Sequence, residues 1–115
     1  MILNVEHKKI EPDITVLEMT GRIITGGDSH RIDWDLTQLV QGNQKKVVFD
    51  LTGVTFLDSS GIGILVMCHA KLRKAGGVLH IAGAQGMVEE TLKMTSVDKI
   101  IPLYPTAAQA SQAFH

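Results

Sequence analysis

The segment KKVVFDL at residues 45–51 most constrains the fold, because it is a continuous apolar run that follows two lysines. A strand without alternating polar residues is typical of a sheet that is covered on both faces. The next segment has apolar residues at helical spacing from Leu65 to Leu72, and VLHIAG at residues 78–83 repeats the strand pattern. Parallel neighbours need a crossover of a dozen or more residues, which a helix supplies. The chain is therefore predicted to alternate strands and helices around a sheet.

The remaining segments extend this alternation toward both ends of the chain. Residues 2–10 and 13–20 are rich in Ile, Val, Leu and Thr and are separated by a turn at Pro12, so they predict a pair of strands. A first helix is predicted to be capped by Asp28 or Ser29 and to end near Gly42, and the strand at 45–51 is followed through Thr52 and Gly53 by a second short piece at Val54 to Leu57. The next helix is predicted to end at Gly76 and Gly77. The last predicted elements are a third helix at 86–97, an edge strand at IIPLY, and a closing helix capped by Thr106.

These elements define the predicted fold class. It is α/β, with a mixed sheet that opens on an N-terminal hairpin and continues in strand-helix units, and with about four helices packed against the sheet. One domain over residues 1–115 is expected, because the length is that of an ordinary single domain.

Charge and cysteine content limit the expected partners. Lys and Arg number 11 against 12 Asp and Glu, so there is no basic field for direct nucleic-acid or anionic membrane binding. Cys68 is the single cysteine, which fits a reducing cytoplasm. The first ten residues lack a leader pattern, and no stretch reaches the ~18 apolar residues of a membrane span. We expect a cytoplasmic protein without a membrane span.

Two serines follow an aspartate at the start of the predicted second helix, in DSSG at residues 58–61. Their simplest role is to satisfy the free N–H groups of the first helical turn. The same N–H groups and the helix dipole favour an anion, so a phosphate on a serine would be accommodated. It would bring roughly −1.5 to −2 charges to the apolar first turns of the helix. Such a charge can switch off an apolar contact surface.

The segment lacks the motifs of enzymatic sites. A phosphate-binding P-loop requires a lysine soon after Gly61 or Gly63, but the first lysine is Lys71. A hydrolase elbow requires G-x-S-x-G, which Ser59 and Ser60 do not meet. No metal-binding motif links the five histidines His7, His30, His69, His80 and His115. We predict no catalytic residue, no metal and no cofactor.

The stretch VVFDLTGVTFLDSSGIGILV at residues 47–66 resembles the central motif of anti-sigma factor antagonists, small bacterial members of the STAS domain family. Residues 79–110 are similar to the closing strand, helix, strand and helix of that family. The resemblance implies a non-enzymatic switch in transcription regulation by partner exchange. The unmodified antagonist binds an anti-sigma factor that is itself a serine kinase, which frees a sigma factor. Phosphorylation by that kinase abolishes the binding, and a serine phosphatase restores it.

The resemblance also implies roles for individual residues. Ser59, the first residue after the aspartate of the motif, is expected to be phosphorylated. Asp58 is expected to help hold the loop and Ser60 to cap the helix, while Gly61 and Gly63 allow close approach of the partner. The full set of predicted partner-contacting residues is Asp58, Ser60, Gly61, Ile62, Gly63 and Asp28.

The chain departs from many relatives at GRII, where Ile24 stands in place of an acid. Asp28 is expected to supply that acid from the following loop. Two other functions stay open on the sequence. One is a scaffold or assembly subunit that is not phosphorylated, for example in a lipid-transport complex, and the other is a small hydrolase that uses Ser59.

Overall fold

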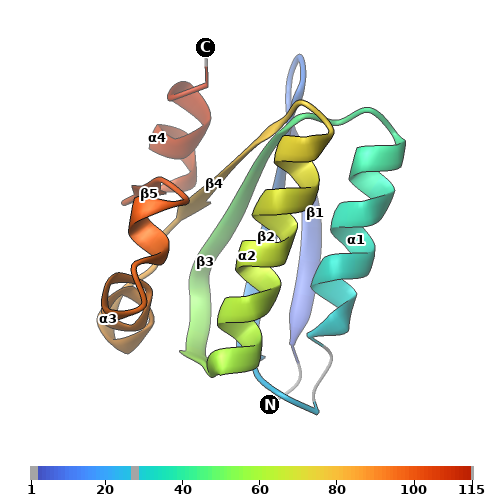
Figure 1. The fold of residues 1–115 in the computed structure, drawn as a ribbon. Helices are drawn as coiled ribbons and strands as arrows, with labels where there is room; N and C mark the ends of the chain where they lie inside the picture. The colour runs from blue at the N-terminus through green and yellow to red at the C-terminus, as the bar shows by residue number, and fades with distance from the viewer. Residues whose placement is uncertain (1–2, 27–28, 115) are drawn as a thin grey trace.

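The computed structural model describes residues 3–26 and 29–114, which form a five-stranded sheet in the order β1-β2-β3-β4-β5 (Figure 1). The elements along the chain are β1 (Asn4–Ile10), β2 (Ile14–Ile23), α1 (His30–Gln41), β3 (Lys46–Leu57), α2 (Ser59–Lys74), β4 (Val78–Ala82), α3 (Gly86–Met94), a 3-10 helix η1 (Val97–Lys99), β5 (Leu103–Tyr104) and α4 (Ala107–Gln112). β1 is antiparallel to β2, and the other neighbours are parallel. The predicted α/β fold with a mixed sheet and an N-terminal hairpin is confirmed.

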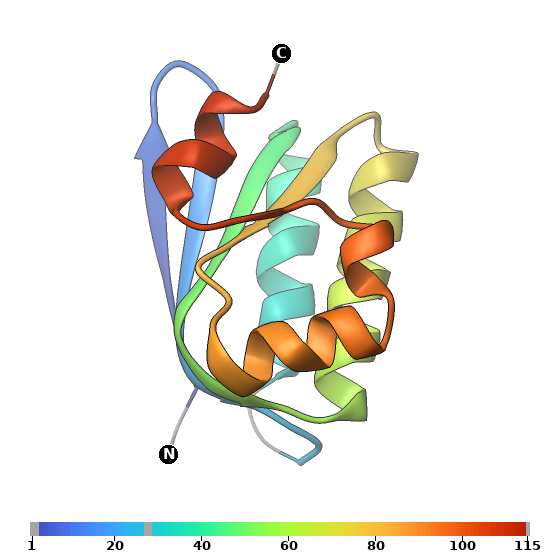
Figure 2. The ribbon, with the colours of Figure 1, turned by 90° about the vertical axis from the view of Figure 1, so that its left-hand side faces the viewer.

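Helices cover the sheet on both faces. Figure 2 shows α4 on one side of the sheet and α1, α2 and α3 on the other. Val47 and Phe49 of β3 join the main core, which also includes residues of these three helices. Val48 points to the opposite face and joins a smaller cluster with Ala110 of α4. This two-sided burial explains why the segment at 45–51 has no polar alternation.

The predicted interruption at Thr52 and Gly53 is wrong, because β3 continues through them to Leu57. Between the pairs Glu18↔Asp50 and Thr20↔Gly53 the register shifts, so two residues of β3 oppose one of β2. This is a β-bulge, which keeps the strand paired while it bends. The side chain of Thr20 occupies the place where a Cβ on Gly53 would lie. The glycine therefore belongs to the strand rather than to a turn.

The start of α1 also differs from the prediction. Ser29 stands at the N-cap position, but its side chain accepts no hydrogen bond from the helix. Its Oγ instead donates to the carbonyl of Ile24 at 3.1 Å, which closes the loop between β2 and α1. Asp28, the other predicted cap, lies outside the described residues.

The C-terminal part follows the prediction with one change. α3 ends at Met94 rather than at residue 97, and Ser96 then adopts a positive φ of 63° before the separate helix η1. Thr106 caps α4 as predicted, because its hydroxyl accepts from the N–H of Gln109 at 3.1 Å. β5 pairs with β4 at the sheet edge, as expected from Pro102. None of the helices in residues 3–26 and 29–114 has the length and hydrophobicity to cross a bilayer.

Candidate functional site

The amino end of α2 lies at the carboxyl ends of β2 and β3 (Figure 1). Asp58 is the N-cap residue with an extended backbone, and Ser59 and Ser60 are the first two residues of the helix. Ile23 at the end of β2 pairs with Leu57, and its carbonyl accepts from the N–H of Asp58 at 3.3 Å. The predicted position of both serines at a helix N-terminus is confirmed.

Asp58 connects two loops through its two carboxylate oxygens. Oδ1 accepts from the N–H of Gly61 at 3.0 Å, and Oδ2 accepts from the N–H of Thr25 at 2.8 Å. These two N–H groups stabilise the charged form of Asp58 and so lower its pKa below the usual 3.8; the N–H of Thr25 has the larger effect and that of Gly61 the next. At neutral pH Asp58 is therefore an ionised cap that also fixes the loop between β2 and α1.

The two serines have different surroundings. The Oγ of Ser60 lies 2.6 Å from the Oγ1 of Thr25, and Ser60 is half-buried. Ser59 is exposed, and within the described residues its hydroxyl makes no hydrogen bond. The prediction that Ser60 caps the helix is wrong, since Asp58 accepts the helix N–H and Ser60 bonds across to the neighbouring loop. Ser59 is thus the hydroxyl of this pair that is open to solvent.

The two glycines of the first turns also differ. Gly61 is buried, and a Cβ built on it would lie 2.5 Å from the carbonyl oxygen of Ile23. Its close approach is therefore to β2 of the same domain, and this packing sets how closely α2 meets the sheet. Gly63 is exposed, and a Cβ there would meet no atom within 4 Å. Of the two, only Gly63 offers open backbone surface.

A groove of about 400 Å³ extends from this loop along the outer side of α1 and α2. Thr25 and Ser60 line it near the loop, and His30, Asp33 and Met67 line it farther along the helices. Asp33 also forms an ion pair with Lys71 of α2 at 2.5 Å, which ties the two helices together.

Two large apolar side chains are exposed on these helices. Trp34 of α1 is 61% exposed and Met67 of α2 is 48% exposed. Ile62, the residue predicted as a surface contact, is half-buried and packs partly against the core. The sequence contained a signal for Trp34, because a helix that buries Ile32 and Leu36 directs the residue midway between them, half a turn away, toward solvent.

Thr25 was not predicted from the sequence, although it contacts both Asp58 and Ser60. Its position two residues after the end of β2 was the available signal, since the carboxyl ends of neighbouring parallel strands meet at one edge. The site is therefore formed by two loops that are far apart in the sequence.

Together these features define a small α/β domain that presents a capped helix N-terminus, with the exposed hydroxyl of Ser59, at one end of a groove that the exposed Met67 also lines. The chain belongs to the STAS domain family, which matches residues 7–110. The family expected from the motif is thereby confirmed.

Several relatives are similar over almost the full chain. The anti-sigma F factor antagonist of Paenibacillus polymyxa is 23% identical over 112 residues, which covers 94% of this chain and 90% of the relative. The crystal structure of an anti-sigma factor antagonist from Mycobacterium paratuberculosis has a TM-score of 0.84 and 27% identity, with 96% and 92% coverage. An anti-sigma-factor antagonist (STAS) domain protein from Planctomyces limnophilus has a TM-score of 0.77 and 27% identity, with 98% of each chain covered.

Proposed function

We propose that this protein is an anti-sigma factor antagonist, a binding module whose unmodified form binds an anti-sigma factor and so frees a sigma factor. The names of its relatives support this function, because their similarity covers nearly the whole chain. The observation that carries the proposal is the exposed hydroxyl of Ser59, which forms no hydrogen bond within residues 3–26 and 29–114 and stands next to the ionised Asp58 at the start of α2.

Phosphorylation of Ser59 is the proposed switch. A phosphate there carries roughly −1.5 to −2 charges and would stand beside the carboxylate of Asp58. The N–H of Gly61 and that of Thr25 are already used by Asp58, so they are not free to neutralise the new charge. The added charge would therefore face outward, toward any bound partner. Docking of an apolar or acidic partner surface would then be unfavourable.

The proposed contact surface combines the loop with the groove between α1 and α2. Gly63 provides an open backbone position and Met67 provides exposed apolar area within the groove, while Trp34 adds exposed apolar area on α1 outside the residues that line it. Exposed aromatic and methionine side chains are enriched at protein interfaces. The partner proposed for this surface is an anti-sigma factor that is also a serine kinase, and a serine phosphatase is proposed to reverse the modification.

The first test is phosphorylation in vitro. The protein is incubated with ATP and the anti-sigma kinase from the same cell, and the modified residue is located by mass spectrometry. We expect phosphate on Ser59 in the wild type, none in Ser59→Ala, and unchanged phosphate on Ser59 in Ser60→Ala, the matched control. A phosphate found only on another residue would contradict the proposed switch.

The second test measures binding of the unphosphorylated protein to the kinase by the change in fluorescence of Trp34, the single tryptophan of the chain. Ser59→Ala is expected to bind as the wild type does, and Ser59→Asp to bind more weakly. Asp is also a good residue at helix starts, so Ser59→Asp should remain folded. Equal binding by all three proteins would favour the scaffold or assembly subunit. Labelling of folded protein at Ser59 by a serine-reactive probe would favour the hydrolase.

A further inference from the structure

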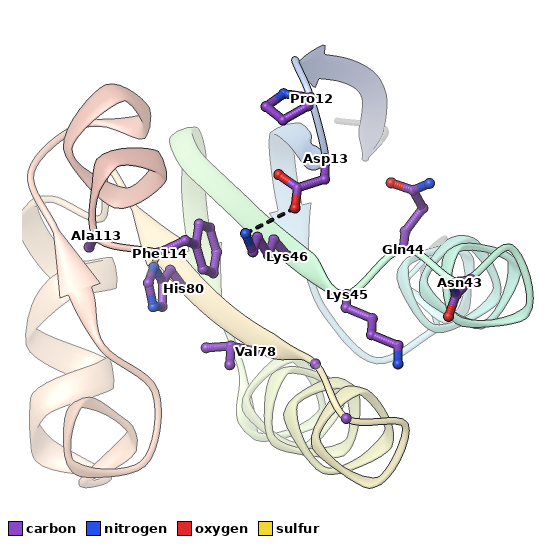
Figure 3. A pocket seen from close by; sticks show the side chains of 12 residues that line it. Pro12, Asp13, Asn43, Gln44, Lys45, Lys46, Val78, His80, Ala113 and Phe114 are labelled. Carbon is purple, nitrogen blue, oxygen red and sulfur yellow. Dashed lines mark ion pairs between the residues drawn. The ribbon is translucent and has the colours of Figure 1, made fainter.

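A second cavity lies at the opposite end of the sheet from Ser59, where β2, β3 and β4 begin (Figure 3). Its volume is about 690 Å³. The turn between β1 and β2, the loop between α1 and β3, the turn between α2 and β4, and the end of α4 together form its walls. This volume is within the range of small-molecule sites, which is about 300–1,000 Å³.

One wall of the cavity is a fixed aromatic surface. The ring of Phe114 stacks on His80 with centroids 4.0 Å apart and an angle of 4° between the planes. His80 is buried, and its Nδ1 lies 2.9 Å from the carbonyl oxygen of Ala110. A carbonyl only accepts, so Nδ1 donates this bond and the imidazole orientation is set. Figure 3 shows Phe114 between His80 and Lys46, and Val78, which is 49% exposed, lies nearby.

The cavity also has a cationic side. Lys46 pairs with Asp13 at 2.9 Å, so its charge is compensated locally. Lys45 makes no ion pair with any described residue, and its side chain runs over the turn between α2 and β4. A Cβ on Gly76 would lie 3.5 Å from the Nζ of Lys45, and a Cβ on Gly77 would lie 2.5 Å from the backbone carbonyl oxygen of Lys45. The ammonium group of Lys45 therefore lies next to the turn between α2 and β4, and the backbone of Lys45 is held there because its carbonyl accepts from the N–H of Val78 at 2.8 Å.

We propose that this cavity binds a small aromatic carboxylate. The flat body of such a ligand fits against Phe114 and Val78, where it removes apolar surface from water. Its carboxylate pairs with Lys45, which forms no ion pair within residues 3–26 and 29–114. The lining residues carry two lysines against one aspartate, so an anion is favoured over a cation of the same shape. The site does not include Ser59, so the test of this inference is independent of the test of the proposed antagonist function.

The test is a titration of the isotope-labelled full chain followed by two-dimensional NMR, with 2-naphthoate as the probe and neutral 2-naphthalenemethanol as its matched control. We expect saturable shifts at the amides of residues 45, 46, 78 and 114. The neutral compound should bind more weakly. Lys45→Met approximately keeps the length of the side chain and removes its charge. It should lower the affinity for 2-naphthoate about fivefold, which is the effect of one partly exposed charge pair.

Lys74→Met is the control variant, because Lys74 is also exposed near the end of α2 but does not line this cavity. Its affinity for 2-naphthoate should equal that of the wild type. The proposal is overturned if 2-naphthoate causes no saturable shifts at these four positions, if the neutral compound binds as tightly, or if Lys74→Met weakens binding as much as Lys45→Met does.

Discussion

The contact between Gly61 and Ile23 gives a stability prediction with a control in the same helix. In Gly61→Ala the new methyl group would lie 2.5 Å from the carbonyl oxygen of Ile23, 3.0 Å from its Cγ2 and 3.2 Å from Cδ2 of Leu57. The first neighbour is backbone of a paired strand, which cannot turn away as the end of a flexible side chain does. The variant must therefore displace the start of α2 from the sheet.

The magnitude follows from a comparison with Gly63→Ala. Both substitutions replace glycine by alanine in the first turns of α2, so both gain up to about 1 kcal/mol of helix propensity. Gly63→Ala meets no atom within 4 Å and should keep this gain. Gly61→Ala also has the cost of overpacking a buried position, about 1–3 kcal/mol. The difference in the free energy of unfolding between the two variants should equal that cost, about 1–3 kcal/mol.

Urea unfolding followed by far-UV circular dichroism measures this difference. With an m value near 2 kcal/mol/M, Gly61→Ala should have a midpoint about 1 M below that of Gly63→Ala. The m values should agree, which would show that the two variants unfold between comparable states. A midpoint for Gly61→Ala equal to or above that of Gly63→Ala would refute the packing argument and the role given to Gly61.

Three further predictions concern side chains of the loop, the core and α4. The pKa of Asp58 is lowered by folding, so its contribution to stability is present above its usual pKa of 3.8 and is lost as the pH falls through the lowered value. Asp58→Asn keeps a capping oxygen but cannot titrate, and its urea midpoint should fall less than that of the wild type between pH values of about 6 and 3. Cys68 is fully buried and burial raises its pKa to about 12, so its thiol should react with an aromatic disulfide reagent only as fast as the protein unfolds; rapid labelling of the folded protein would contradict this. Thr106→Ala removes the cap of α4 and should lower the free energy of unfolding by about 1 kcal/mol, measured by the same urea titration, whereas Thr106→Ser should retain most of it.

Local patterns in the sequence predicted most of the fold. The apolar run at residues 45–51 indicated a strand covered on both faces, and Thr106 marked the start of α4, because burial and capping leave signals within a few residues. The bulge at Gly53 left no such signal. The need for glycine there comes from the side chain of Thr20 on the neighbouring strand, a contact that no local pattern contains.

The residues of the candidate site were likewise predictable only in part. The sequence pattern predicted that Asp58, Ser59 and Ser60 stand at a helix start, as Asp and Ser capping residues do, and the structure places them there. The choice of Ser59 over Ser60 came from the family resemblance alone. The different surroundings of Ser59 and Ser60 were not predictable, because they depend on Thr25, which lies 35 residues before Ser60. The pairing of Ile23 with Leu57 brings Thr25 near Asp58 and Ser60, and this pairing between distant segments is not contained in any local sequence pattern.

The double contact of Thr25 limits where this domain tolerates changes in chain length. Thr25 stands two positions after the end of β2, and its N–H and hydroxyl must reach Asp58 and Ser60 together. An inserted residue before Thr25 would move both groups out of reach, whereas insertions beyond Gly26 leave them in place. STAS domains that keep both contacts should therefore differ in the length of the loop between β2 and α1 only beyond the position of Gly26.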